Sequence, residues 1–342
     1  MLKRLACAML ALILLGAAAL AEEAVPLAFW TDSEARADAM RAAAALWNED
    51  HPDQAIELSV TRFDSDIIDD KMWTAMHSGV LMPGLQQPDI ADIEYARFPR
   101  YVNPQIWLLC PLSRWLGAQP GTAYAAFTYG NLCMGIPVGS GEMGVIYNAR
   151  ALEGAGIDAG EIRTWDDFIS AGRRYRRETG NAFLAVDMDS YLVFLTVYQQ
   201  LSTGDSDIDA VYARTLAFLT SLFDANVACV MPGGRADSRA FREAFDSGAA
   251  ACAFVRLEDA DGYDARIGPV PAMGGEAGVW IPGRALCVTT FCDDIDLAAA
   301  FVEFAAGTVS EPPEGVLFPG NTEDTLDYIQ NYKLELAKMI LQ

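Results

Sequence analysis

The sequence predicts an α/β fold of two lobes. Short apolar runs alternate with longer segments in which apolar residues recur at helical spacing. The strand-helix-strand-helix-strand order near the N-terminus favours a mostly parallel sheet covered by helices on both faces. A chain of 342 residues is long enough to form more than one hydrophobic core, so two lobes are expected.

The N-terminal part of the chain predicts the start of the first sheet. The expected order is a strand at 25–30, a helix at 33–49, a strand at 55–60, a helix at 67–78 and a short strand at 88–93. Met40, Ala44 and Trp47 share one face of the first helix. Ligands of such sheets bind at the carboxyl ends of the strands. Those ends are expected at residues 30–32 and 93–97.

The rest of the chain repeats this alternation. Strands are expected at 135–138, 144–147, 182–186, 249–255 and 285–289, and helices at 151–156, 164–179, 191–201, 211–226, 238–247 and 295–306. Thr164 and Asp167 have the spacing of a capping box, in which each side chain bonds to the backbone of the other residue.

The first residues predict export. Two basic residues precede an uncharged apolar run from Leu5 to Leu15, and Ala19-Leu20-Ala21 offers small residues to a signal peptidase. The run is shorter than a membrane span, and it lacks the polar face of a buried N-terminal helix. Cys7 lies too early for lipid attachment. A signal peptide at 1–21 is therefore expected, and the mature protein should be periplasmic or extracellular, with no lipid anchor.

Composition and missing motifs narrow the chemistry. The chain has 47 acidic and 24 basic residues, a balance that disfavours nucleic acid and anionic membranes as partners. The six cysteines after the leader form no CxxC pair, and the two histidines do not suggest a metal site. No GxSxG, HExxH or Walker-type loop is present. We therefore expect no metal, no cofactor and no enzymatic activity.

Four groups of residues form a recognisable order. They are Phe29-Trp30 with the helix end Leu46 to Pro52; Pro88-Asp89-Ile90 with Arg97-Phe98 and Tyr101; Gly135 to Val138 with Val145 to Asn148, Ala155 to Ile157 and Thr164 to Phe168; and Ala244 to Cys252 with Gly268 to Pro271 and Gly274-Gly275. In this order and spacing, over about 25–306, the chain resembles the family 1 extracellular solute-binding proteins, the group that includes maltose-binding protein.

The resemblance implies a fold like that of the type II periplasmic binding proteins, with two α/β lobes, a ligand cleft and hinge crossings. Residues 22–138 with a returning segment of about 276–310 would form lobe 1, and residues 139–275 lobe 2. The crossings are expected near 137–142 and 271–278, where glycines suit a hinge, although ordinary turns would also use them. The family's role is to deliver a mono- or oligosaccharide to permease subunits of an ABC importer, here as a monomer.

Candidate ligand contacts combine aromatic faces for sugar C–H surfaces with planar polar groups for hydroxyls. They are Trp30, Asp32, Glu94, Tyr95, Arg97, Glu142, Asp187, Asp189, Tyr191, Arg256 and Trp280. Most of them follow an expected strand end. Arg97 matches a ligand-contacting arginine of the resembled family, and Glu142 stands one place from a ligand carboxylate. The alternatives are core packing for the tryptophans and solvated surface positions for the carboxylates.

Two other functions stay open, and one departure from the family is evident. Cleft carboxylates would also suit a polyamine or another cation. The pair Asp69-Asp70 could serve a secreted hydrolase, although neighbours on a helix point in different directions. Family members usually continue with several more helices, whereas 307–342 here predicts a short tail with one helix, at 322–341.

Overall fold

The computed structural model describes residues 24–65, 67–81, 86–103, 106–116, 122–139, 141–189, 191–202, 207–274 and 279–307. The expected signal peptide and the expected tail helix lie outside these residues. None of the described helices is long and apolar enough to cross a membrane.

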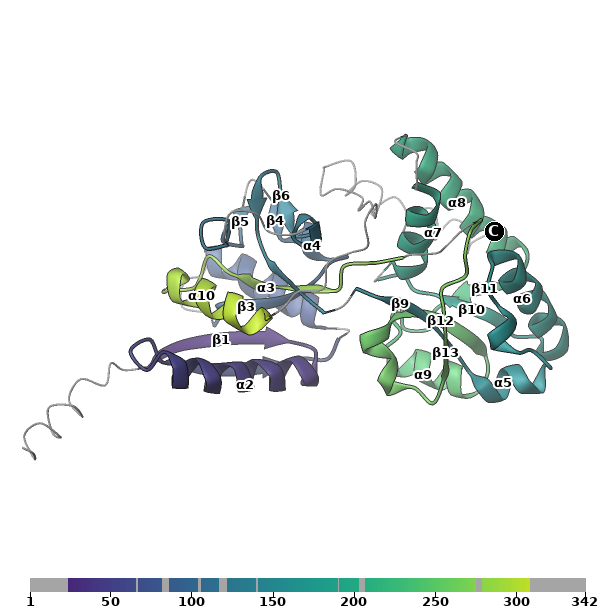
Figure 1. Ribbon diagram of the computed structural model, residues 1–342, viewed down its shortest axis with the longest axis horizontal. Helices are drawn as coiled ribbons and strands as arrows, with labels where there is room; N and C mark the ends of the chain where they lie inside the picture. The colour runs from purple at the N-terminus through teal and green to yellow at the C-terminus, as the bar shows by residue number, and fades with distance from the viewer. Residues whose placement is uncertain are drawn as a thin grey trace, which may run out of the picture.

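The first sheet has the strand order β2-β1-β3-β14-β8 (Figure 1). Its strands are β1 (Val25–Thr31), β2 (Ile56–Arg62), β3 (Ile90–Glu94), β8 (Ile136–Val138) and β14 (Arg284–Val288). β1 pairs in parallel with β2 and β3, whereas β14 pairs antiparallel with β3 and β8. Four strands therefore run in one direction, and β14 runs against them.

The second sheet has the order β11-β10-β12-β9-β13 and the same plan. Its strands are β9 (Met143–Tyr147), β10 (Ala182–Val186), β11 (Ala228–Val230), β12 (Ala250–Arg256) and β13 (Arg266–Gly268). β10 pairs in parallel with β11 and β12, and β9 pairs antiparallel with β12 and β13.

One strand of each sheet is reversed because of how the chain enters that sheet. β9 and β14 are the first strands after the chain passes from one sheet to the other. Each begins beside a carboxyl end, since Met143 pairs with Arg256 and Arg284 pairs with Glu94. The carboxyl ends of the two sheets therefore face each other, and an arriving strand has to run the opposite way.

Helices cover the sheets. They are α2 (Glu34–Asp50), α3 (Ile68–Leu81), α4 (Thr122–Ala125), α5 (Ala149–Gly154), α6 (Trp165–Thr179), α7 (Leu192–Ser202), α8 (Ile208–Asp224), α9 (Arg239–Asp246) and α10 (Ile295–Ala306), with 3-10 turns η1 (Phe98–Arg100), η2 (Ala159–Glu161) and η3 (Leu257–Gly262). The expected capping box begins α6: the N–H of Asp167 donates to Thr164 Oγ1 at 3.1 Å, and the N–H of Thr164 donates to Asp167 Oδ2 at 2.9 Å.

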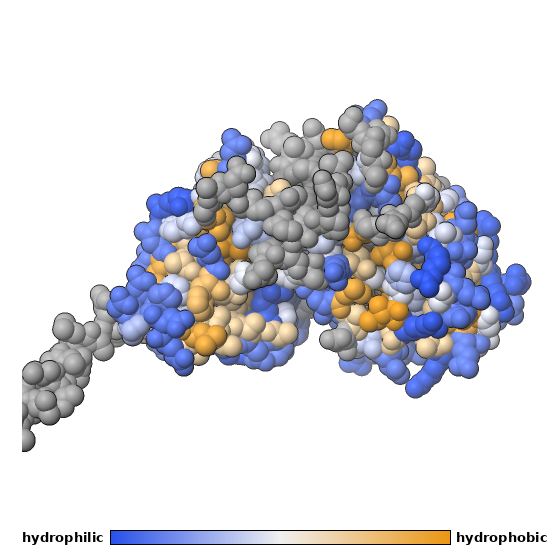
Figure 2. Space-filling model, in the orientation of Figure 1, coloured by the Kyte–Doolittle hydropathy of each residue, from blue (hydrophilic) through white to orange (hydrophobic). Residues whose placement is uncertain are grey.

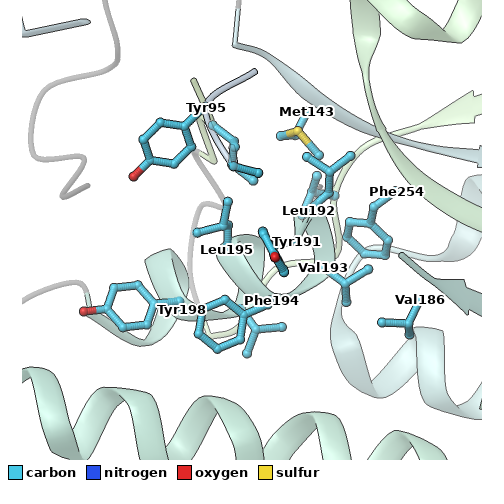
Figure 3. Close-up of a cluster of buried hydrophobic side chains, with 14 of the residues drawn as sticks. Tyr95, Met143, Val186, Tyr191, Leu192, Val193, Phe194, Leu195, Tyr198 and Phe254 are labelled. Carbon is cyan, nitrogen blue, oxygen red and sulfur yellow. The ribbon is translucent and has the colours of Figure 1, made fainter. Parts of the chain in front are cut away.

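The apolar cores follow the division into two sheets only in part. One core joins α2 and α10 to a face of the first sheet, where Trp47 meets Phe301 and Phe304 edge-on. The largest core includes residues of both sheets. In it Tyr95, which follows β3, lies near Leu192 and Leu195 of α7 (Figure 3).

Two segments connect the sheets, and their described residues, 139, 141–142, 269–274 and 279–283, bring them side by side at Gly141 and Ile281. The N–H of Ile281 donates to the carbonyl of Gly141 at 2.9 Å, and Glu142 forms an antiparallel bridge with Trp280. Gly141 has φ +65°, and a Cβ there would lie 2.3 Å from the Trp280 ring. Glycine is required at this position both by its conformation and by the close approach of the indole.

Four short strands complete the described structure: β4 (Val102–Asn103) pairs with β5 (Ile106–Trp107), and β6 (Thr128–Tyr129) with β7 (Leu132–Cys133). No strand is expected from the sequence at these positions, nor at β11 and β13; two or three residues seldom reveal a period, and β8 is the short strand whose apolar run was long enough to be expected.

Candidate functional site

A cavity of about 490 Å³ lies between the facing ends of the two sheets. Figure 2 shows the surface notched between the two halves of the molecule. The first sheet and its connections supply Asp32, Ser33, Glu34, Ala35, Arg36, Glu94 and Arg284; the second half supplies Leu192, Arg235, Ala236, Asp237, Arg242, Val255, Arg256, Glu258, Asp259, Gly262 and Tyr263. The lining is mostly charged.

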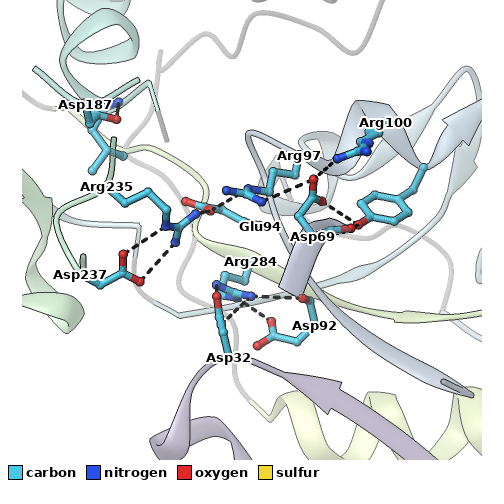
Figure 4. A network of polar contacts seen from close by, with 12 residues as sticks. Asp32, Asp69, Asp92, Glu94, Arg97, Arg100, Asp187, Arg235, Asp237 and Arg284 are labelled. Atoms are coloured by element: carbon cyan, nitrogen blue, oxygen red, sulfur yellow. Dashed lines mark hydrogen bonds and ion pairs between the residues drawn. The ribbon is translucent and has the colours of Figure 1, made fainter. Parts of the chain in front are cut away.

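Glu94 joins the two halves at the floor of this cavity (Figure 4). Its carboxylate accepts from Arg235 Nη1 at 2.8 Å and from Arg256 Nη2 at 3.2 Å, and the side chain is only 3% exposed. Burial alone would raise the pKa of Glu94, but the surrounding guanidinium groups hold it well below its usual range. Glu94 is therefore a buried anion that contacts two arginines of the other sheet.

A second network belongs to the first sheet. Arg284 Nη2 lies 2.9 Å from Asp32 Oδ1, and Arg284 Nε lies 2.8 Å from Asp92 Oδ1. Asp92 is fully buried and also accepts from Thr31 Oγ1 at 2.7 Å. Arg284 thereby fixes Asp32 at the end of β1, where its carboxylate faces the cavity.

Arg97 faces a neighbouring network around Asp69. Arg97 Nη1 lies 3.4 Å from Asp69 Oδ2, and Tyr101 donates to Asp69 Oδ1 at 2.6 Å. Arg100 contacts the same carboxylate. Asp70, in contrast, is 82% exposed. The Asp69-Asp70 pair is therefore divided between a bonded, largely buried carboxylate and a solvated one.

Asp187, Asp189 and Tyr191 follow β10. Asp187 is buried and accepts from the N–H of Leu192 at 3.0 Å and of Val193 at 3.4 Å, so it caps the start of α7. Burial raises the pKa of Asp187 to about 6, against the effect of these N–H groups. Tyr191 adopts φ +56° and is 6% exposed, and Asp189 is half-buried.

The candidate aromatic residues are mostly enclosed. Trp30 is 7% exposed and meets Phe63 edge-on at 4.9 Å, and its Nε1 has no hydrogen-bond partner among the described residues. Trp280 is 4% exposed, and the Gln199 amide bonds to its backbone N–H at 3.1 Å and carbonyl at 2.6 Å. Tyr95 is buried, and burial raises its pKa above the usual value.

The structure brings three of the candidates, Asp32, Glu94 and Arg256, to the cavity. Arg97 reaches it indirectly, with Nε 3.7 Å from Glu94. Glu142 is exposed on the first connection, beside Trp280. A ligand contact through Trp30, Tyr95, Glu142, Asp187, Asp189, Tyr191 or Trp280 stays a prediction.

Sequence reasoning missed four arginines of the lining: Arg36, Arg235, Arg242 and Arg284. Arg235 follows Gly233 and Gly234, which both have positive φ and turn the chain after β11. That glycine pair after an apolar run was a signal for a site at a strand end. Arg284 begins a strand, and the other two lie on helices, where an arginine is ordinarily a surface residue.

The fold consists of two sheets, each with one reversed strand, and paired connections join the sheets beside a polar cavity. This arrangement defines a two-lobed solute-binding fold. The chain belongs to the bacterial extracellular solute-binding protein family, whose sequence model matches residues 42–311. The expected fold class and family are thereby confirmed. The family is extracellular, in agreement with the expected export.

Relatives and solved structures agree with this assignment. An arabinooligosaccharide-binding protein of Halalkalibacterium halodurans is 27% identical over 317 residues, which cover 83% of this chain and 68% of that protein. An arabinooligosaccharide-binding protein of Bacillus subtilis is 25% identical over 305 residues, which cover 82% of this chain and 69% of that protein. The galacto-N-biose-/lacto-N-biose I-binding protein of Bifidobacterium longum has a similar fold, with a TM-score of 0.59 and 19% sequence identity. The match covers 90% of this chain and 86% of that protein.

Proposed function

We propose that this protein captures an oligosaccharide in the cavity between its sheets and delivers it to permease subunits of an ABC importer. The observation that carries the proposal is the cavity of about 490 Å³, in whose lining four of the five arginines are paired with carboxylates. Its volume is within the range of about 300–1,000 Å³ usual for small-molecule sites. Arginine–carboxylate pairs present donors and acceptors together, as sugar hydroxyls require.

The same pairing disfavours a polyamine. A cationic ligand needs carboxylates that lack a positive partner, because only those repay the desolvation of its charge. Asp32 has Arg284 at 2.9 Å, and Glu94 has Arg235 at 2.8 Å. An oligosaccharide therefore suits the lining better than a cation.

The relatives' names support the sugar assignment, and no hydrolytic role is proposed. Asp69 is bonded to Arg97 and Tyr101, and its sequence neighbour is solvated, so this pair offers no acid and base aimed at one bond. We propose a binding protein without catalysis that is exported as a monomer, with its signal peptide removed near residue 21 and no lipid anchor.

We further propose that residues 22–138 with about 276–310 form one lobe and that residues 139–275 form the other. The paired connections at Gly141 and Ile281 would be the hinge. Asp32, Glu94 and Arg256 would contact the sugar. Trp30 would offer its indole N–H, which has no partner in the described part of the chain, when the cleft opens.

The test is calorimetric titration and thermal shift with neutral and acidic oligosaccharides and with spermidine. We expect at least one oligosaccharide to bind and to raise the melting temperature, because it binds the folded state alone. Spermidine should have no effect. Binding of spermidine with no response to any sugar would overturn the proposal.

Asp32→Asn provides a check on the position of the site. It should weaken sugar binding, since Asp32 faces the cavity. The matched control is Asp158→Asn, which removes an exposed carboxylate paired with Arg266 at 2.8 Å away from this cavity. Equal affinities for both variants would place the sugar elsewhere.

A further inference from the structure

We infer that the captured oligosaccharide carries a carboxylate, as in a uronic acid unit, and that Arg242, Arg256 and the start of α2 receive it. The inference rests on the proposed function and names the class of sugar. It is carried by two residues that line the cavity: the Arg242 guanidinium and the Nε–H of Arg256 are not engaged by any carboxylate of the described residues.

Arg242 is the first such donor. It lies on α9 and lines the cavity, where its Nη1 donates to the carbonyl of Gly262 at 3.0 Å and its guanidinium lies 5.0 Å over the ring of Tyr263. No carboxylate of the described residues lies within ion-pair distance of it. The other four lining arginines each have one: Arg36 Nε lies 3.2 Å from Asp92, Arg235 Nη1 2.8 Å from Glu94, Arg256 Nη2 3.2 Å from Glu94 and Arg284 Nη2 2.9 Å from Asp32.

Arg256 is the second. Arg256 is 5% exposed, and the two terminal nitrogens of its guanidinium contact Glu94. Its Nε is buried with no hydrogen-bond partner among the described residues. An unsatisfied buried guanidinium N–H is costly, so a ligand acceptor that reaches this nitrogen when the cleft opens would be favoured there.

The start of α2 adds a favourable field. This helix has 17 residues, and Ser33 to Arg36 at its beginning line the same cavity. The N-terminal end of a helix carries partial positive charge that suits an anion. The N–H groups of Ser33 and Arg36 are already bonded to Thr31 Oγ1 and Ser33 Oγ, so the contribution of α2 is this field rather than those donors. Arg242 on α9 and Arg256 on β12 thus border one space with the positive end of α2.

The cavity's carboxylates explain why an anion fits better than a further hydroxyl. Five of the six lining carboxylates have an arginine partner: Asp32 and Glu94 are held by arginines of the lining, Asp237 lies 3.1 Å from Arg235, Asp259 3.7 Å from Arg256, and Glu34 3.0 Å from Arg62. A hydroxyl placed among donors also needs an acceptor for its own proton, whereas a carboxylate only accepts and can engage an arginine through both oxygens.

Net charge does not drive this preference. Six carboxylates and five arginines line the cavity. The preference for an acidic sugar comes from the arginine N–H groups that no carboxylate of the described residues engages. A uronate should therefore bind through short-range contacts with Arg242 and Arg256 rather than through long-range attraction.

The test compares matched neutral and acidic sugars by calorimetric titration of the full mature protein. The probes are galactobiose and digalacturonate, and cellobiose and cellobiouronic acid. We expect the acidic member of at least one pair to bind about 10- to 100-fold more tightly than the neutral one, the factor for hydrogen bonds to a charged group. Arg242→Gln should bring the ratio of the acidic to the neutral affinity close to one, whatever its effect on the affinity for the neutral member alone.

Arg239→Gln is the matched control. Arg239 lies on the same helix, is 92% exposed and pairs with Glu243 at 2.7 Å, and it does not line the cavity. This variant should keep the preference. Neutral sugars that bind as tightly as their acidic partners would overturn the inference and leave the proposed function standing. No binding by any member, together with no response to any sugar of the wider panel, would overturn both.

Discussion

Glu94 joins the two sheets through buried charge, and Glu94→Gln tests how much this contributes to stability. The carboxylate is 3% exposed and contacts Arg235 and Arg256, whose side chains are 9% and 6% exposed. Glutamine keeps the shape but leaves two buried guanidinium groups without their shared anion. Breaking a buried ion pair in this way costs about 3–5 kcal/mol. We expect a loss of that size in the free energy of unfolding.

Denaturant unfolding followed by circular dichroism measures the loss. The control is Asp237→Asn, because Asp237 also pairs with Arg235, at 3.1 Å, but is 43% exposed. An exposed pair contributes about 1 kcal/mol or less. The Glu94 contacts also hold the halves together, so the ligand-free variant should have a larger radius of gyration in solution scattering. Equal stability losses in the two variants would refute the reasoning.

Three further predictions follow from other contacts. The pKa of Asp187 is raised to about 6, so folding favours its protonated form. The free energy of unfolding of the wild type, measured relative to that of Asp187→Asn, should therefore fall as the pH rises from about 4 to about 6. An unchanged difference between the two proteins over this window would contradict the prediction. Gly141→Ala should cost about 2–4 kcal/mol, since it adds left-handed strain to a clash with the Trp280 indole, whereas Gly130→Ala, at φ +59° with open space around it, should cost about 1–2 kcal/mol. Trp280→Ala should cost about 3–5 kcal/mol of stability, because its side chain is 4% exposed; a weakened sugar affinity at unchanged stability would instead make it a ligand contact.

The sequence predicts the fold well where its signals are local. The expected strand at 182–186 and helix at 295–306 coincide with β10 and α10. The Thr164–Asp167 capping box forms because its two partners are only three residues apart and need no other segment.

The site was harder to predict because its contacts join distant segments. Glu94 and Arg235 are 141 residues apart, and no local pattern shows that a carboxylate after one strand will meet an arginine after another. Trp280 carried the same aromatic signal as a ligand contact, yet its surroundings are set by Gly141 and Gln199 from two other segments. The carboxyl ends of the strands indicated the region in which the cavity lies, and tertiary packing decided which side chains line it.

A crystal structure of the complex with the tightest-binding oligosaccharide of the panel tests the central claim most directly. The account predicts the sugar between the start of α2 and the segment from Arg235 to Tyr263, in contact with Asp32, Glu94 or Arg256. Density for the sugar outside this cavity, for example in the separate cavity of about 440 Å³ lined by Leu152 and Arg266, would contradict it.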